Sequence, residues 1–226
     1  MFTFPLLLTI YAGFAHAFEA DHLLAVSNIV SQRNNIKLSL KDGIFWGLGH
    51  ASTIFFIGML MIIFKAGISV NYFHYFEAVI GLMLITLAVY RLIKFFSTKK
   101  IIIHTHPHVH SGEHHQHLHV HIDAAQKHIH PHSLAYGVGL VHGLAGSGAL
   151  IVIVMSQMKG PVDGLTYLLI FGIGCIAGMV LASGLFSIPF SKKIMKAQAL
   201  QTFLIIVSSV LCLLYGGKVI YENLIA

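Results

Sequence analysis

The chain has 226 residues, of which 56% are hydrophobic and only 10% charged, less than half the charged share of ordinary soluble domains. This composition excludes a soluble globular domain and indicates an integral membrane protein. The formal net charge of +6 does not indicate nucleic-acid binding, because the basic residues lie between apolar stretches rather than on one soluble face.

Six apolar stretches are each near or above the roughly 20 residues that a bilayer requires. They cover residues 4–30, 42–64, 73–96, 134–157, 163–190 and 200–221. We therefore predict an all-α polytopic membrane protein, with six transmembrane helices in a single domain that covers residues 1–226.

Lysine and arginine are distributed unevenly between the two sides of the predicted helices. The connections after the first, third and fifth stretches hold 11 of the 14 basic residues, and only Lys65, Lys159 and Lys218 lie on the other side. The positive-inside rule then places both termini outside and the long central connection in the cytoplasm. We expect a multi-pass protein of the cell membrane.

The first stretch holds four ionisable side chains within seven residues: His16, Glu19, Asp21 and His22. Ionisable groups at membrane depth are costly, so they usually mark a functional site. A continuous helix would place His16, Glu19 and His22 on one face. Asp21 would lie off that face, so either it turns to a neighbouring helix or the helix is irregular here.

Imidazole nitrogens together with carboxylate oxygens suit a first-row divalent cation such as nickel, cobalt or zinc. The alternative is a buried polar cluster that only holds helices together. We favour a metal site, because intramembrane ionisable residues default to function.

The second stretch carries the segment GLGHAST, in which Gly47 and Gly49 flank His50. The glycines allow another helix to come close. We favour a ligand or gate role for His50 over a simple hydrogen bond between helices.

The central segment, residues 104–132, contains 12 of the 17 histidines, many of them at every second position. Such alternation lines one side of an extended chain with imidazoles. Because Pro107, Gly112 and Pro131 interrupt the segment, we predict a cytoplasmic loop that is disordered without metal and buffers metal at weak sites.

The fourth stretch carries GLVHGLAGSGAL, in which His142 stands among small residues. Residues 13–18 match residues 139–144 at an offset of 126, and residues 47–50 match residues 172–175 at an offset of 125. We therefore predict two three-helix repeats, about 1–100 and 133–226, of opposite topology, with the site near the midplane where the repeats meet.

Three of these segments resemble motifs of the nickel/cobalt transporter family. The pattern H-x-x-x-x-D-H from His16 to His22 resembles its signature, and GLGHAST resembles its L-G-H-S-T box with Ala51 intervening. The segment around His142 resembles the small six-span branch, similar to urease-cluster nickel permeases and nickel/cobalt efflux proteins. It departs from the eight-span permeases, whose corresponding segment is rich in Asp and Thr. The resemblance implies transport of Ni2+ or Co2+.

We accordingly predict a transporter of divalent transition-metal ions and not an enzyme, with uptake favoured over efflux. Nickel and cobalt are the expected cargo, with zinc as a further candidate, and no prosthetic group is expected. The expected partners are the metal ion and membrane lipid, with a cytoplasmic metallochaperone as a candidate. The predicted metal site consists of His16, Glu19, Asp21, His22, His50 and His142.

Three alternatives remain at the level of the sequence. The first is an efflux protein of the same family. The second is a membrane di-iron oxygenase, which would need fixed histidine clusters rather than a proline-punctuated tract. The third is a haem-bearing electron carrier with histidine axial ligands, against which the neighbouring carboxylates argue.

Overall fold

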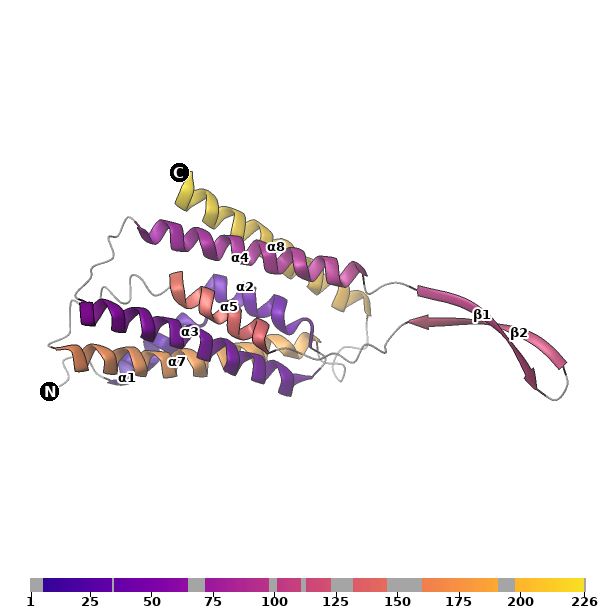
Figure 1. Ribbon diagram of the computed structural model, residues 1–226, viewed down its shortest axis with the longest axis horizontal. Helices are drawn as coiled ribbons and strands as arrows, with labels where there is room; N and C mark the ends of the chain where they lie inside the picture. The colour runs from indigo at the N-terminus through magenta and orange to yellow at the C-terminus, as the bar shows by residue number, and fades with distance from the viewer. Residues whose placement is uncertain are drawn as a thin grey trace.

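The protein is an all-α membrane protein with a β-hairpin attached to one end of its helical bundle (Figure 1). The computed structural model describes residues 6–33, 35–64, 72–97, 101–110, 113–122, 132–145, 160–190 and 198–225. Within these ranges the α-helices are α1 (Leu6–His16), α2 (Ala20–Val30), α3 (Ile36–Phe64), α4 (Phe73–Ser97), α5 (Ser133–Ala145), α7 (Pro161–Ser187) and α8 (Gln198–Leu224). A short 3-10 helix, η2 (Ile188–Phe190), continues α7.

Four of the described helices, α3, α4, α7 and α8, are long and apolar enough to cross a membrane. The prediction of six continuous spans is therefore met only in part. Residues 4–30 do not form one helix, because the chain is interrupted between α1 and α2. The fourth expected span, 134–157, is helical as α5 up to Ala145, and its remainder lies outside the described residues.

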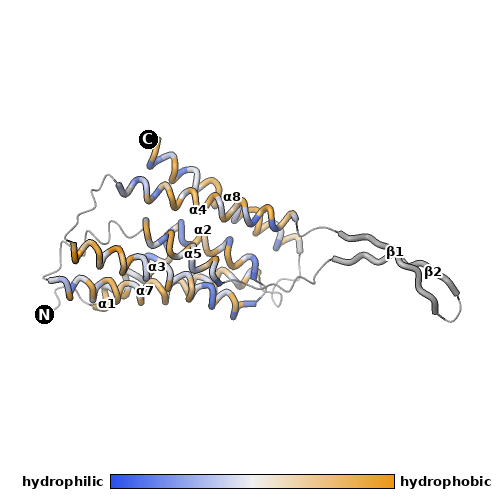
Figure 2. The backbone as a smooth tube through the Cα atoms, viewed as in Figure 1, coloured by the Kyte–Doolittle hydropathy of each residue, from blue (hydrophilic) through white to orange (hydrophobic). Residues whose placement is uncertain are grey.

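The helices form layers (Figure 1). α4 packs against α8, and α3 packs against both α7 and α5, while α1 packs against α7. α2 contacts α4, α7 and α8, and lies with α5 between the other two layers. Figure 2 shows hydrophobic residues along the length of the helices and hydrophilic residues at the end of α3 nearest the hairpin.

The close approaches between helices occur in pairs at a nearly constant sequence offset. Gly13 of α1 lies against the carbonyl oxygen of Phe171 in α7, and Gly139 of α5 lies in the same way against the carbonyl oxygen of Trp46 in α3. Each pair maps onto the other at the offset of 125 or 126 that the sequence shows. A side chain at either glycine would collide with backbone, so these positions set the distance between the helices.

A buried polar cluster fastens the bundle at its hairpin end. Arg33, which follows α2, donates two hydrogen bonds to the Asp42 carboxylate of α3, one of them over 2.8 Å. His132, directly before α5, lies 2.8 Å from the same carboxylate. Asp42 is almost fully buried, and its partners are the guanidinium group of Arg33 and the imidazole of His132, so the charge of the carboxylate is compensated inside the protein.

The hairpin occupies most of the segment that the sequence predicts to be a disordered loop. β1 (Ile101–His110) pairs antiparallel with β2 (Glu113–Ile122), and three histidine positions of one strand stand opposite histidine positions of the other. These pairs are His104–His119, His106–His117 and His108–His115. An isolated two-stranded hairpin is at best marginally stable in water, so disorder in the absence of metal stays a prediction.

The first prediction from the fold concerns glycine packing. A methyl group at Gly139 would meet the Trp46 carbonyl oxygen, so Gly139→Ala should lower the free energy of unfolding by about 1–3 kcal/mol, as overpacking does. Gly137→Ala is the matched control on the same helix, because no atom of the described part of the chain lies within 4 Å of its added methyl group. Thermal unfolding in detergent measures both, and equal stability of the two variants would refute the close approach.

The second prediction concerns membrane topology. α1 begins, α8 ends and α7 begins at the end of the bundle opposite the hairpin (Figure 1). We therefore expect Ser97→Cys, at the exposed end of α4, to react with a membrane-impermeant thiol reagent only from the cytoplasmic side. Val162→Cys, at the 76% exposed start of α7, should react only from outside. Labelling of both from one side would contradict the arrangement, and the wild-type protein, whose two cysteines are buried, gives the background.

Candidate metal centre

The first expected span is interrupted within its cluster of ionisable residues. α1 ends at His16 and α2 begins at Ala20. In the turn between them the Phe18 N–H donates to the Ala15 carbonyl over 2.9 Å, and Glu19 adopts an extended conformation at the start of α2. The prediction that one helix presents a common face is therefore wrong, and the alternative of an irregular helix is what the structure shows.

The interruption changes which residues can meet. His16 belongs to the last turn of α1, whereas Asp21 and His22 belong to the first turn of α2. A carboxylate in the first turn is favourable because it faces the positive end of the helix dipole. Asp21 can thus lie beside His22 in the centre instead of pointing away from it.

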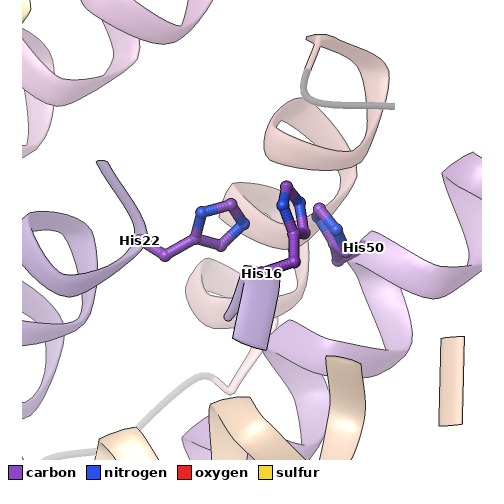
Figure 3. A group of neighbouring side chains, drawn as sticks. All are labelled: His16, His22 and His50. Carbon is purple, nitrogen blue, oxygen red and sulfur yellow. The ribbon is translucent and has the colours of Figure 1, made fainter. Parts of the chain in front are cut away.

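Three histidines from three helices form the first group of side chains. His16 of α1, His22 of α2 and His50 of α3 each offer a ring nitrogen, and these nitrogens lie within 4.8 Å of one another. Figure 3 shows the three side chains converging from separate segments of the chain. His22 and His50 are fully buried, and His50 lies about half-way along α3.

A second group shares His22 with the first. Asp21, His22 and His142 of α5 also bring one ligand atom each within 4.8 Å of the others. The rings of His22 and His142 stack with centroids 4.4 Å apart and an interplanar angle of 14°. The Nε2 atom of His142 lies 3.5 Å from an oxygen of Asp21.

Two carboxylates fix the orientation of two of these imidazoles. Glu19 lies 2.8 Å from Nδ1 of His16, and Asp21 lies 3.0 Å from Nδ1 of His22. An ionised carboxylate only accepts hydrogen bonds, so each Nδ1 carries the proton and Nε2 keeps the lone pair. Metal-binding histidines are commonly held by carboxylates in this way.

The remaining ring nitrogens of the cluster are buried and have no hydrogen-bond partner among the described residues. They are Nε2 of His16, Nε2 of His22 and both nitrogens of His50 and of His142. Because native proteins rarely leave buried polar groups unsatisfied, such a concentration requires an explanation. A divalent cation would accept the lone pairs, and Asp21 and Glu19 together would balance its charge.

The structure thus brings together all six residues that the sequence predicts for the site, in unequal roles. His16, Asp21, His22, His50 and His142 lie in the two groups of candidate ligands. Glu19 contacts His16 but is 58% exposed and belongs to neither group. That these residues bind a metal stays a prediction.

Two aromatic residues of the site have no counterpart in the sequence prediction. The Trp46 ring of α3 lies 5.7 Å from His22 and 5.9 Å from His142, and Phe171 of α7 lies 5.7 Å from His16. Trp46 and Phe171 are 125 residues apart, which is the offset between the two predicted repeats, and Trp46 precedes His50 by one helical turn. These two spacings are the signals that could have identified them.

The fold and the centre define a multi-pass membrane protein that buries a cluster of imidazoles and carboxylates between its helices. The chain belongs to the family described as cytochrome C biogenesis protein transmembrane region, whose family model matches residues 12–217. It is also similar to the urease accessory protein UreH of Bacillus sp. (strain TB-90), with 35% identity over 192 residues, which are 85% of this chain and 80% of the relative. No solved structure matches the chain.

The match corrects the resemblance to the nickel/cobalt transporter family that the sequence motifs suggested. The family model covers almost the whole chain, from the middle of α1 to the last turns of α8. The resemblance rests on three short segments, around His16–His22, His50 and His142. Imidazoles and carboxylates in apolar spans are residue types that would suit a cation in chains of different families.

A stability measurement tests whether His50 is part of a binding site or of the packing. Replacing an unsatisfied buried imidazole by an apolar side chain of similar size removes a desolvation cost, so in the presence of a chelator His50→Leu should unfold with equal or about 1 kcal/mol higher free energy. The rise in melting temperature on adding nickel or cobalt should shrink in the same variant.

The control for this experiment is Ile54→Ala, one turn further along α3. Ile54 is buried and apolar, so its truncation should cost about 2–5 kcal/mol and leave the cation-dependent rise intact. If His50→Leu is destabilised as much as Ile54→Ala, His50 has a packing role.

Proposed function

We propose that the protein carries a divalent transition-metal cation across the membrane. The observation that supports the proposal is the buried cluster itself: four imidazoles and two carboxylates meet where α1 and α5 end and α2 begins, beside His50 at the middle of α3, a helix of membrane-spanning length. Ionisable residues at membrane depth mark ion pathways. Exchangeable binding requires neutral imidazoles and ionised carboxylates.

Nickel and cobalt are the first cations to test, with zinc as a third. Imidazole is a preferred ligand of all three, and a single carboxylate among imidazoles does not favour magnesium or calcium, which prefer oxygen ligands. The similarity to a protein named as a urease accessory protein supports a nickel-related role.

We further propose uptake as the direction of transport. From the positive-inside rule we expect the hairpin in the cytoplasm, where its histidines would receive an imported cation and pass it to a metallochaperone. We expect binding and release of the cation without a chemical reaction on it.

The family description names cytochrome C biogenesis, so haem binding and, because the chain has two cysteines, thiol chemistry are other uses to consider, and the described side chains argue against both. A haem with two axial histidines needs the imidazoles on opposite sides of a porphyrin, whereas these four rings lie against one another at centroid distances of 4.4–5.3 Å. The two cysteines of the chain, Cys175 and Cys212, are buried and unpaired on different helices, α7 and α8.

Asp21→Asn tests the proposal most directly. The amide keeps the shape of the carboxylate and its capacity to accept a hydrogen bond from His22, but it removes the negative charge that balances the cation. We expect accumulation of nickel or cobalt in cells, measured by mass spectrometry against cells without the protein, to fall at least tenfold at an unchanged amount of inserted protein.

The matched control is Asp163→Asn in the first turn of α7, where the carboxylate belongs to neither group of candidate ligands. This variant should accumulate the cation as the wild type does. Wild-type accumulation by Asp21→Asn would exclude the cluster as the transport site.

A further inference from the structure

We propose that the centre consists of two overlapping binding sites that share His22, and that a single cation occupies them in turn. The first site is His16, His22 and His50, and the second is Asp21, His22 and His142. The inference rests on the proposed function, because it describes how the transported cation is held.

The two sites draw on different parts of the chain. All ligands of the first site come from α1, α2 and α3, which precede the hairpin. The second site adds His142 of α5, which follows the hairpin. A cation in the second site therefore links the two halves of the protein, whereas a cation in the first site is held by one half alone.

His22 can complete only one of the sites at a time. A neutral imidazole has one nitrogen lone pair, and with Nδ1–H donating to Asp21 that lone pair is on Nε2. In this arrangement Asp21 orients His22 toward the first site. When Asp21 itself becomes a ligand, this hydrogen bond is given up and His22 turns its lone pair to the second site, keeping its one proton.

Simultaneous occupation by two cations is also opposed by charge. The two sites share His22, and within each site the candidate ligand atoms lie within 4.8 Å of one another. Two divalent ions would therefore lie close together and repel each other strongly in a buried environment. Asp21 and Glu19 supply two negative charges, which balance one divalent ion and not two.

The ligand character of the sites differs enough to make the exchange useful. The first site offers three neutral nitrogens, and the second replaces one of them by an anionic oxygen. A cation that binds either set with comparable strength can pass from one to the other without leaving the protein. The cation is then released into the compartment to which the occupied site opens.

The test uses cobalt and single cysteine reporters in the full-length protein. Cobalt bound by a thiolate gives a near-ultraviolet charge-transfer band, to which the histidines of the hairpin contribute nothing. His50→Cys reports on the first site and His142→Cys on the second. The wild type, with Cys175 and Cys212, gives the baseline, and Ser209→Cys, buried on α8 away from both sites, is the matched control.

A second substitution then disables one site in each reporter. Asp21→Asn should lower the band of His142→Cys at least threefold and raise that of His50→Cys. His16→Ala should lower the band of His50→Cys at least threefold and raise that of His142→Cys. This reciprocal redistribution is the result expected of one cation shared between two sites.

Three other results would overturn the inference. If both substitutions lower both bands together, the residues form a single site. If each substitution lowers only the band of its own site and leaves that of the other reporter unchanged, two cations bind independently. If only one reporter gives a band above the Ser209→Cys control, the other group does not ligate. Loss of cobalt binding in all variants together with absence of transport by the wild type would instead refute the proposed function.

Discussion

The interruption of the chain between α1 and α2 is the feature on which the centre depends. An uninterrupted helix satisfies its own backbone and directs Asp21 away from His16 and His22. The turn from Ala17 to Glu19 separates these side chains onto two helices and exposes the start of α2 to the interior of the bundle. Backbone irregularity at membrane depth is tolerated where it is surrounded by protein, and here α1 packs on α7 while α2 contacts α3, α4, α7 and α8.

Glycine packing makes the convergence of four helices geometrically attainable. Gly139 and Gly143 of α5 lie against the backbone of α3 at Trp46 and His50. This approach carries His142 on α5 to the stack with His22, and the equivalent approach of Gly13 to Phe171 holds α1 and therefore His16. The energy that holds the centre together thus comes from close backbone packing, while the imidazoles themselves remain available.

Part of this organisation could be predicted from the sequence, and the limit has a physical origin. His16, His22, His50 and His142 stand out because an apolar span makes any ionisable residue conspicuous. Trp46 and Phe171 do not stand out, because aromatic residues are ordinary members of such spans. The place of the interruption after His16 could not be predicted, since the apolar run through residues 4–30 is continuous and a periodic pattern assumes an unbroken helix. Only the position of Asp21 off the common face pointed to an irregular helix. The family was misassigned because short patterns of imidazoles, carboxylates and glycines reflect side-chain chemistry and not the ancestry of the chain.

The cluster at the hairpin end shows how the position of His142 is secured from a distance. A buried ion pair adds little net stability, since desolvation of the charges offsets their attraction, but it strongly specifies which groups lie together. Asp42 of α3 holds both Arg33 at the end of α2 and His132 at the start of α5. The same three helices carry imidazoles of the centre: α3 carries His50, α2 carries His22 and α5 carries His142. One carboxylate therefore fixes the relative placement of three of the four imidazoles, at a point that adjoins the histidine-rich segment and lies outside the centre itself.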